Sequence, residues 1–73
     1  MNKIEIGNTA GKVWRLLDGE GDLSIQEIKQ KLDAPDPLLY LAFGWLCRED
    51  KIHCYESEGK YILSKKISNT FFG

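Results

Sequence analysis

Three side chains near the middle of the chain could bind a soft metal ion or form a nucleophile and base pair: Cys47, His53 and Cys54. Structural zinc needs four ligands in a tetrahedral arrangement, commonly supplied as two closely spaced pairs. This set supplies three ligands in a C-x5-H-C spacing, and the sequence has no further cysteine or histidine. We therefore predict no metal site and no metal cofactor.

A cysteine–histidine catalytic pair is also disfavoured, because His53 and Cys54 are neighbours on a predicted strand. Successive side chains of a strand point to opposite faces of the sheet. We expect Cys54 to be a small core residue and His53 to be exposed. The two cysteines form no C-x-x-C pair, which is typical of a protein from a reducing compartment.

The acidic residues are not arranged for catalysis. Most of them fall in predicted turns and helix caps, where carboxylate oxygens accept backbone N–H bonds. The segment Gly19-Glu20-Gly21 lacks the rest of either nucleotide-binding fingerprint. We predict no catalytic site and no cofactor. The carboxylates concerned are Asp18, Glu20, Asp22, Asp33 and Asp36.

Composition predicts one small folded domain over residues 1–73. The chain is 42% hydrophobic and 29% charged, as globular domains are, and its formal net charge is −1. This charge gives no general attraction to nucleic acid or to an anionic membrane. No run approaches the roughly 18 apolar residues of a membrane span, and MNKIEIGN lacks the apolar block of a secretory signal. We expect a soluble cytoplasmic protein.

The elements that position these residues begin with a helix predicted over residues 8–18. Asn8 or Thr9 could cap it, whereas Ile6 continues the apolar stripe and favours an earlier start. The segment DGEGD, residues 18–22, ends it with glycines able to adopt positive φ. The stripe consists of Ala10, Val13, Trp14 and Leu17.

A second helix follows Leu23 and begins with a capping box formed by Ser24 and Glu27. Its apolar stripe consists of Ile25, Ile28 and Leu32.

A turn of about four residues separates this helix from a third one, which makes a helix-turn-helix. Asp33 stands where a turn needs a residue tolerant of the left-handed region, and Ala34-Pro35 prevents smooth continuation. Asp36 is the predicted N-cap of the third helix, with Pro37 at its first position.

After Asp50 the apolar period changes from that of a helix to that of strands. Ile52 and Cys54, then Tyr61 and Leu63, alternate with polar neighbours. Residues 57–59, Ser-Glu-Gly, predict a hairpin loop between them. A β-hairpin behind a helix-turn-helix is a wing, and Leu23 could add a short strand at its edge. The predicted fold class is α+β, a winged helix-turn-helix.

The end of the third helix and the residues after it form a block of the form A-x-G-W-L-x-R-E-D-K-I. Its residues are Ala42, Gly44, Trp45, Leu46, Arg48, Glu49, Asp50, Lys51 and Ile52, with Asn8, Ala10, Gly11, Lys12, Trp14, Leu16 and Leu17 upstream. Through these residues, the chain resembles a small bacterial and archaeal winged helix-turn-helix family of unknown function over about residues 4–63. The resemblance implies a winged-helix fold, a DNA-binding or regulatory role and no known catalytic site.

The third helix carries an unusual outer face. We expect Leu39, Ala42, Phe43 and Leu46 to pack on the core, with Ile52 continuing the stripe. The other side then carries Tyr40, Leu41, Gly44, Trp45 and Arg48. A DNA reader places polar and cationic side chains there to contact base edges and phosphates. Here one cation stands against Asp36 and Glu49, and the wing adds Glu56 and Glu58 against Lys60.

Exposed aromatic residues of this kind are typical of protein interfaces, and a two-fold axis lets one patch cover itself. We predict a protein interface formed by the third helix and the end of the chain. The alternative is that Trp45 is a core residue under the hairpin or under Phe71-Phe72. The predicted interface residues are Tyr40, Leu41, Trp45, Arg48, Phe71 and Phe72.

Basic residues of the second helix and wing could make weak phosphate contacts, or could be an ordinary solvated surface. Lys51, which precedes the wing, belongs to the same group of basic residues. The candidates for nucleic-acid contact are Lys29, Lys31, Arg48, Lys60, Lys65 and Lys66.

The last ten residues, 64–73, form a tail in this prediction. This tail contains three large apolar residues, Ile67, Phe71 and Phe72, which are unusual in a tail that contacts only solvent. The tail either packs back on the first helix or frays, or it docks onto a partner.

The leading hypothesis is a non-catalytic regulatory or adaptor module that acts through protein contacts, mainly homodimerisation. The alternative is a DNA-binding transcription regulator, which fold-level analogy favours and the cation count disfavours. No membrane partner and no small-molecule ligand are predicted.

Overall fold

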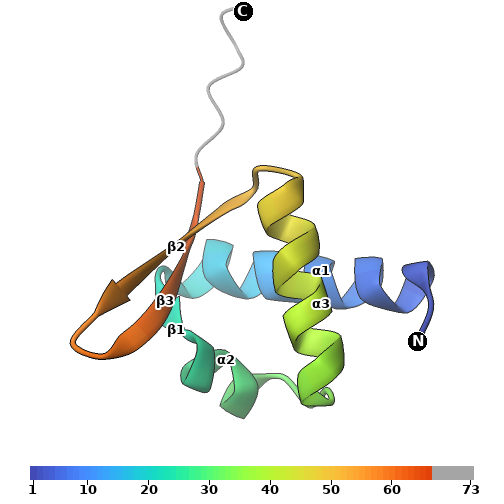
Figure 1. Cartoon of the computed structure of the whole chain (residues 1–73), viewed down its shortest axis with the longest axis horizontal. Coiled ribbons are helices and arrows are strands. Elements are labelled where there is room, and N and C mark those ends of the chain that lie inside the picture. The colour runs from blue at the N-terminus through green and yellow to red at the C-terminus, as the bar shows by residue number, and fades with distance from the viewer. Residues whose placement is uncertain (67–73) are drawn as a thin grey trace, which may run out of the picture.

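The computed structural model describes residues 1–66 (Figure 1). Three helices and three strands follow one another in the order expected for a helix-turn-helix with a wing. The elements are α1 (Lys3–Glu20), β1 (Leu23–Ser24), α2 (Ile25–Lys31), α3 (Asp36–Arg48), β2 (Ile52–Ser57) and β3 (Lys60–Lys65). The strands form one antiparallel sheet in the order β1-β3-β2.

Helix α1 begins five residues before the predicted start at Asn8, and neither Asn8 nor Thr9 is its cap. Asn2 is the N-cap, and its side chain accepts a hydrogen bond from the Glu5 backbone N–H at 2.8 Å. The Glu5 carboxylate accepts the Asn2 N–H at 3.1 Å, which completes a capping box. The early start follows because this box satisfies otherwise unpaired N–H groups of the first turn.

Helix α1 ends within the predicted segment 18–22, two residues beyond its predicted last residue, Asp18. Gly21 is the C-cap, with φ of 87°, and its N–H donates to the Leu17 carbonyl at 2.9 Å. The left-handed region suits glycine because it has no Cβ.

Helix α2 begins with the predicted capping box. Glu27 N–H donates to Ser24 Oγ at 3.1 Å, and Ser24 N–H donates to Glu27 Oε1 at 2.9 Å. The backbone hydrogen bond lowers the pKa of Glu27, as the side-chain hydrogen bond also does, because both favour the charged carboxylate.

Two details of the following turn were predicted wrongly. Asp33 does not adopt positive φ; among non-glycine residues 1–66 only Asp50 and Glu58 do so. Pro35, not Asp36, is the N-cap of α3, so Asp36 opens the helix and Pro37 follows it. Asp36 instead forms an ion pair with Lys29, at 3.0 Å, across the turn.

The wing is a hairpin of β2 and β3 that projects away from the end of the molecule carrying the N-terminus (Figure 1). Its loop has two residues, Glu58 with φ of 52° and Gly59 with φ of 78°, because Ser57 pairs with Lys60 as part of the ladder. Positive φ at both central positions is the signature of a type I′ turn, whose twist matches that of the strands.

The predicted edge strand at Leu23 is present, pairing with β3 at Leu63. Strand β3 continues to Lys65, so its last two residues fall within the range 64–73 that was predicted as the tail. The predicted packing of Ile67, Phe71 and Phe72 lies outside the described residues.

The core lies between α1, α3 and the inner face of the sheet. The predicted inner stripe of α3, Leu39, Ala42, Phe43 and Leu46, is buried, as is Ile52. The prediction that Cys54 is a core residue is wrong, because β2 is exposed from its second residue onward and helices cover only its first. Other core residues are Ala10, Val13, Leu17, Leu23, Ile28 and Leu63.

These helices and this sheet confirm the predicted α+β, winged helix-turn-helix fold class. Among residues 1–66, none of the helices has the length and hydropathy that crossing a bilayer requires.

Candidate functional site

The outer side of α3 carries large apolar side chains in contact with solvent. Tyr40 is 50% exposed, Leu41 48% and Trp45 39%. Gly44 and Arg48 are exposed beside them. Because cations and amides are the groups that read bases and phosphates, this surface offers little for DNA to bind.

Trp45 packs partly on α1, at Gly7. A Cβ built on Gly7 would lie 3.8 Å from Cζ2 of the indole, so the missing side chain lets the helix and the ring approach. The ring nevertheless keeps more than a third of its surface exposed. Within residues 1–66, Trp45 is therefore not the sealed core residue that the alternative required, and the hairpin does not cover it.

Tyr40 lies on a different side of α3 from Trp45. At about 100° per residue, five positions turn the helix by roughly 140° beyond a full turn. The Tyr40 ring packs edge to face against Phe43, with centroids 6.0 Å apart, and Lys29 Nζ lies 6.0 Å from its centroid. The predicted interface set is thus divided between two surfaces.

The start of α1 carries a further exposed apolar side chain, which the sequence prediction did not identify. Ile4 is 73% exposed and stands one helical turn before Gly7, whereas Leu41 stands one turn before Trp45 on α3. We call Ile4, Leu41 and Trp45 the apolar face. Ile4 could have been found from the i, i+3 spacing to Gly7, had the early start of α1 been recognised.

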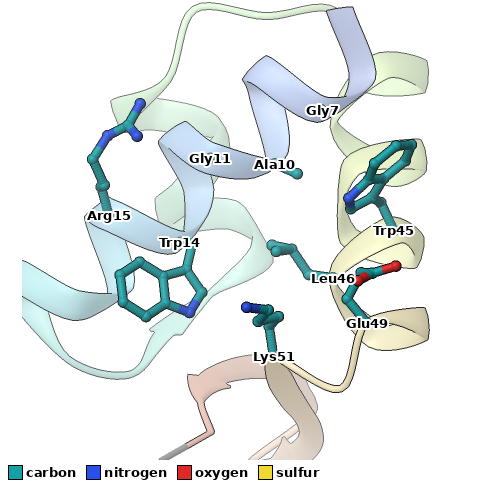
Figure 2. Close-up of a pocket in the computed structure, with 9 residues that line it drawn as sticks. All are labelled: Gly7, Ala10, Gly11, Trp14, Arg15, Trp45, Leu46, Glu49 and Lys51. Carbon is teal, nitrogen blue, oxygen red and sulfur yellow. The ribbon is translucent and has the colours of Figure 1, made fainter. Parts of the chain in front are cut away.

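A groove runs beside this face, between α1 and the end of α3 (Figure 2). Its volume is about 330 Å³. Figure 2 shows the indoles of Trp14 and Trp45 on opposite sides, with Leu46 and Lys51 between them. The groove is lined by Gly7, Ala10, Gly11, Trp14, Arg15, Trp45, Leu46, Glu49 and Lys51.

Trp14 has two properties that matter for this groove. Lys65 Nζ lies over its ring, 5.2 Å from the centroid, in cation–π geometry. Its Nε1 is buried and has no hydrogen-bond partner within residues 1–66. A buried donor without an acceptor is uncommon in native structures. The Nε1 group of Trp14 is therefore an unusual feature of the groove wall.

Four of the six predicted nucleic-acid contacts are already paired with carboxylates. Lys29 pairs with Asp36, and the hydrogen bond and charge of that carboxylate raise the pKa of Lys29. The hydrogen bond and charge of Lys66 in turn lower the pKa of Asp50. The other two pairs are Lys31 with Glu20, at 3.1 Å, and Lys65 with Asp18.

A second hollow, of about 230 Å³, lies between α2, Tyr40 and the tip of the wing. Lys29 and Lys60 both line it, beside Tyr40 and Tyr61. Two of the predicted phosphate contacts are therefore brought together here, although one of them is paired with Asp36.

The soft side chains are not assembled into a site. Cys47, His53 and Cys54 are all exposed. Desolvation raises the pKa of Cys54, with a smaller contribution from Cys47, which is the opposite of what activates a thiol. Within residues 1–66, no three His, Cys, Asp or Glu side chains are grouped so as to hold a metal ion.

The helix-turn-helix, the edge strand and the hairpin together define a winged-helix domain, a class of DNA-binding and regulatory modules. The chain belongs to the winged helix-turn-helix domain family DUF2582, whose model matches residues 1–65.

A relative in the archaeon Methanocaldococcus jannaschii is named Uncharacterized protein MJ1608. It is 41% identical over 64 residues, which cover 85% of this chain and 91% of the relative. The similarity therefore spans almost the whole of both chains.

Proposed function

We propose that this domain is a non-catalytic regulatory or adaptor module that self-associates through the apolar face. One observation carries the proposal: Leu41 and Trp45 are large apolar side chains that remain 48% and 39% exposed on the outside of α3. Aromatic side chains are enriched in protein interfaces, and contiguous exposed apolar patches on a monomer commonly mark interaction sites.

A homodimer suits this face because Leu41 of one copy could pack against Trp45 of the other. Leu41 and Trp45 lie one turn apart along α3. A two-fold axis crossing the helix between them would bring Leu41 against the partner's Trp45, and each contact would occur twice. Ile4 of α1 would extend the contact at its rim.

Charge supports protein contact over DNA. Nonspecific affinity for DNA comes mainly from lysine and arginine residues that neutralise phosphates. Lys29, Lys31, Lys65 and Lys66 are paired with carboxylates, which a phosphate would have to displace. A cytoplasmic location belongs to the same proposal, because Cys47 and Cys54 are free thiols.

A second candidate, a DNA-binding transcription regulator, is favoured by the hollow that Lys29 and Lys60 share at the tip of the wing. Positive side chains beside Tyr40 and Tyr61 could contact a phosphate there. This function would use the opposite side of α3 from Trp45.

Two measurements on the purified chain separate these functions. Light scattering over a range of concentrations should give twice the monomer mass, falling on dilution. A gel-shift titration with mixed-sequence duplex DNA should show no binding at micromolar protein. A monomeric mass at all concentrations contradicts self-association. Micromolar DNA binding that weakens steeply with salt would favour the regulator.

A further inference from the structure

We infer that the two α3 helices of the dimer pack antiparallel and cross at Gly44, with Arg48 of each copy paired with the partner's Asp36. This inference rests on the proposed self-association. It adds the orientation of the two copies and the residue at which their backbones meet. Gly44 is the key residue, because packing among residues 1–66 does not require a glycine there.

Gly44 lies in the interior of α3, where a glycine weakens the helix. A Cβ built on it would meet nothing within 4 Å in the described part of the chain, and Gly44 is exposed. Gly7 differs, because a Cβ there would lie 3.8 Å from Cζ2 of the Trp45 indole. A second backbone that approaches α3 from outside would explain Gly44, because a residue without a side chain allows close approach.

Gly44 shares the outer surface of α3 with the two large apolar side chains of that helix. At about 100° per residue, the exposed residues from 41 to 48 on this surface fall within an arc of roughly 100°, nearly opposite the buried stripe. They are Leu41, Gly44, Trp45 and Arg48. Gly44 therefore leaves a depression beside Leu41 and Trp45, at a height between them.

Two-fold symmetry places this depression at the centre of the contact. If Leu41 lies against the partner's Trp45, the helices run antiparallel and the axis passes at the level of residue 43, midway between positions 41 and 45. The Gly44 residues of the two copies are then two positions apart along the helices, or about 3 Å. They meet near the axis, where two crossing helices approach most closely.

The charges of α3 favour the same orientation. Its acidic residue, Asp36, lies in the first turn and its basic residue, Arg48, in the last turn. Antiparallel packing brings Arg48 within two positions, about 3 Å along the helix, of the partner's Asp36, whereas parallel packing would bring like charges together. Lys29 contacts only Oδ2 of Asp36, at 3.0 Å, and a carboxylate can accept at both oxygens. Oδ1 can therefore accept a hydrogen bond from the Arg48 guanidinium.

Isotope-filtered NOE spectroscopy on a mixture of labelled and unlabelled protein tests the orientation directly. We expect intermolecular cross-peaks between the Leu41 methyl groups and the partner's Trp45 indole, and between the Hα protons of the two Gly44 residues. Cross-peaks from Leu41 to the partner's Leu41 in place of those to Trp45 would show parallel helices and overturn the inference. Missing intermolecular cross-peaks from Gly44 would overturn the crossing point.

Gly44→Ala should have opposite effects on the fold and on the dimer. Alanine favours the helix, so in the monomeric Leu41→Glu background it should raise the urea midpoint of unfolding. In the otherwise unchanged chain, the new methyl groups would collide at the axis and raise the dissociation constant at least about tenfold. Gly19→Ala is the matched control, because Gly19 is an exposed helical glycine where a Cβ also meets nothing within 4 Å.

A charge exchange tests the pairing between the copies. Arg48→Asp and Asp36→Arg should each raise the dissociation constant roughly tenfold, because two exposed ion pairs become two repulsive contacts. An equimolar mixture of the two variants should restore the affinity of the parent protein, whereas Lys60→Asp on the wing should change little. Unchanged affinity in Arg48→Asp, or a mixture that dimerises no better than its components, would overturn the predicted pairing.

The outcomes separate this inference from the proposed function. A parent chain that is monomeric at all concentrations would overturn both. A dimer that Leu41→Glu dissociates but Gly44→Ala leaves unchanged would overturn only the crossing at Gly44.

Discussion

Replacing Trp45 by glutamate should separate the dimer into folded monomers. An accessible tryptophan side chain presents roughly 250 Å². With 39% exposed, about 100 Å² of the Trp45 indole remains to be buried at an interface. At about 25 cal/mol per Å², the two indoles of a symmetric dimer contribute about 5 kcal/mol. Trp45→Glu should therefore raise the dissociation constant of the dimer at least about a thousandfold.

The assay is light scattering after size exclusion, with circular dichroism on the same samples. Leu41→Glu is a second variant, because Leu41 is 48% exposed and does not line the groove. It should give the same loss of mass with the helical signal unchanged. Tyr61→Glu is the control, since it adds the same charge to a ring that is 58% exposed on the wing, away from the apolar face.

Three results would refute this reasoning. Dimers that survive both Trp45→Glu and Leu41→Glu would place the interface elsewhere. Dissociation by Tyr61→Glu as well would show a general effect of added charge. Loss of helical content in Trp45→Glu would identify the indole as part of the core, despite its exposed surface.

Other regions of the fold give further predictions. Glu58→Asn should stabilise the domain by up to about 1 kcal/mol in urea unfolding, because asparagine tolerates the φ of 52° that glutamate is forced to adopt; equal or lower stability would contradict the turn assignment. Glu27→Gln should keep the capping box but flatten the dependence of stability on pH. The folded pKa of Glu27 lies below its usual value near 4.5, so this stabilisation is present above that value and is lost as pH falls through the lower folded value. An unchanged acid profile in urea unfolding would argue against this. Leu39→Ala should cost about 2–5 kcal/mol because Leu39 is fully buried, and a loss under 1 kcal/mol by the same assay would contradict its place in the core.

Much of the fold was predictable because its determinants are local. The capping box of Ser24 and Glu27 is a four-residue pattern, and the apolar stripe of α3 repeats at helical spacing. The wing follows from alternation on both sides of a turn that contains Gly59. The early start of α1 was also encoded, in Asn2 and Glu5, but the prediction gave more weight to Asn8 and Thr9.

The candidate site was predictable only in part. The exposed side of α3 followed from its period, so Leu41 and Trp45 were identified. Tyr40 was grouped with them because the prediction divided α3 only into an inner and an outer side, although five positions at about 100° per residue separate Tyr40 from Trp45. Cys54 was placed in the core because alternation identifies the two faces of a strand, but not whether a helix covers one of them.

The sequence by itself determined which elements form, because the hydrogen bonds of caps, turns and helices join residues only a few positions apart. It also determined which side of each element is apolar, because that side follows from the spacing of the apolar residues. Only the tertiary structure decided what lies opposite each side. The pairing of Lys65 with Asp18 joins residues 47 positions apart, and Gly7 meets Trp45 across two different helices. Such contacts depend on how packed helices cross, which no local pattern specifies. The groove and the paired lysines therefore became visible only in three dimensions.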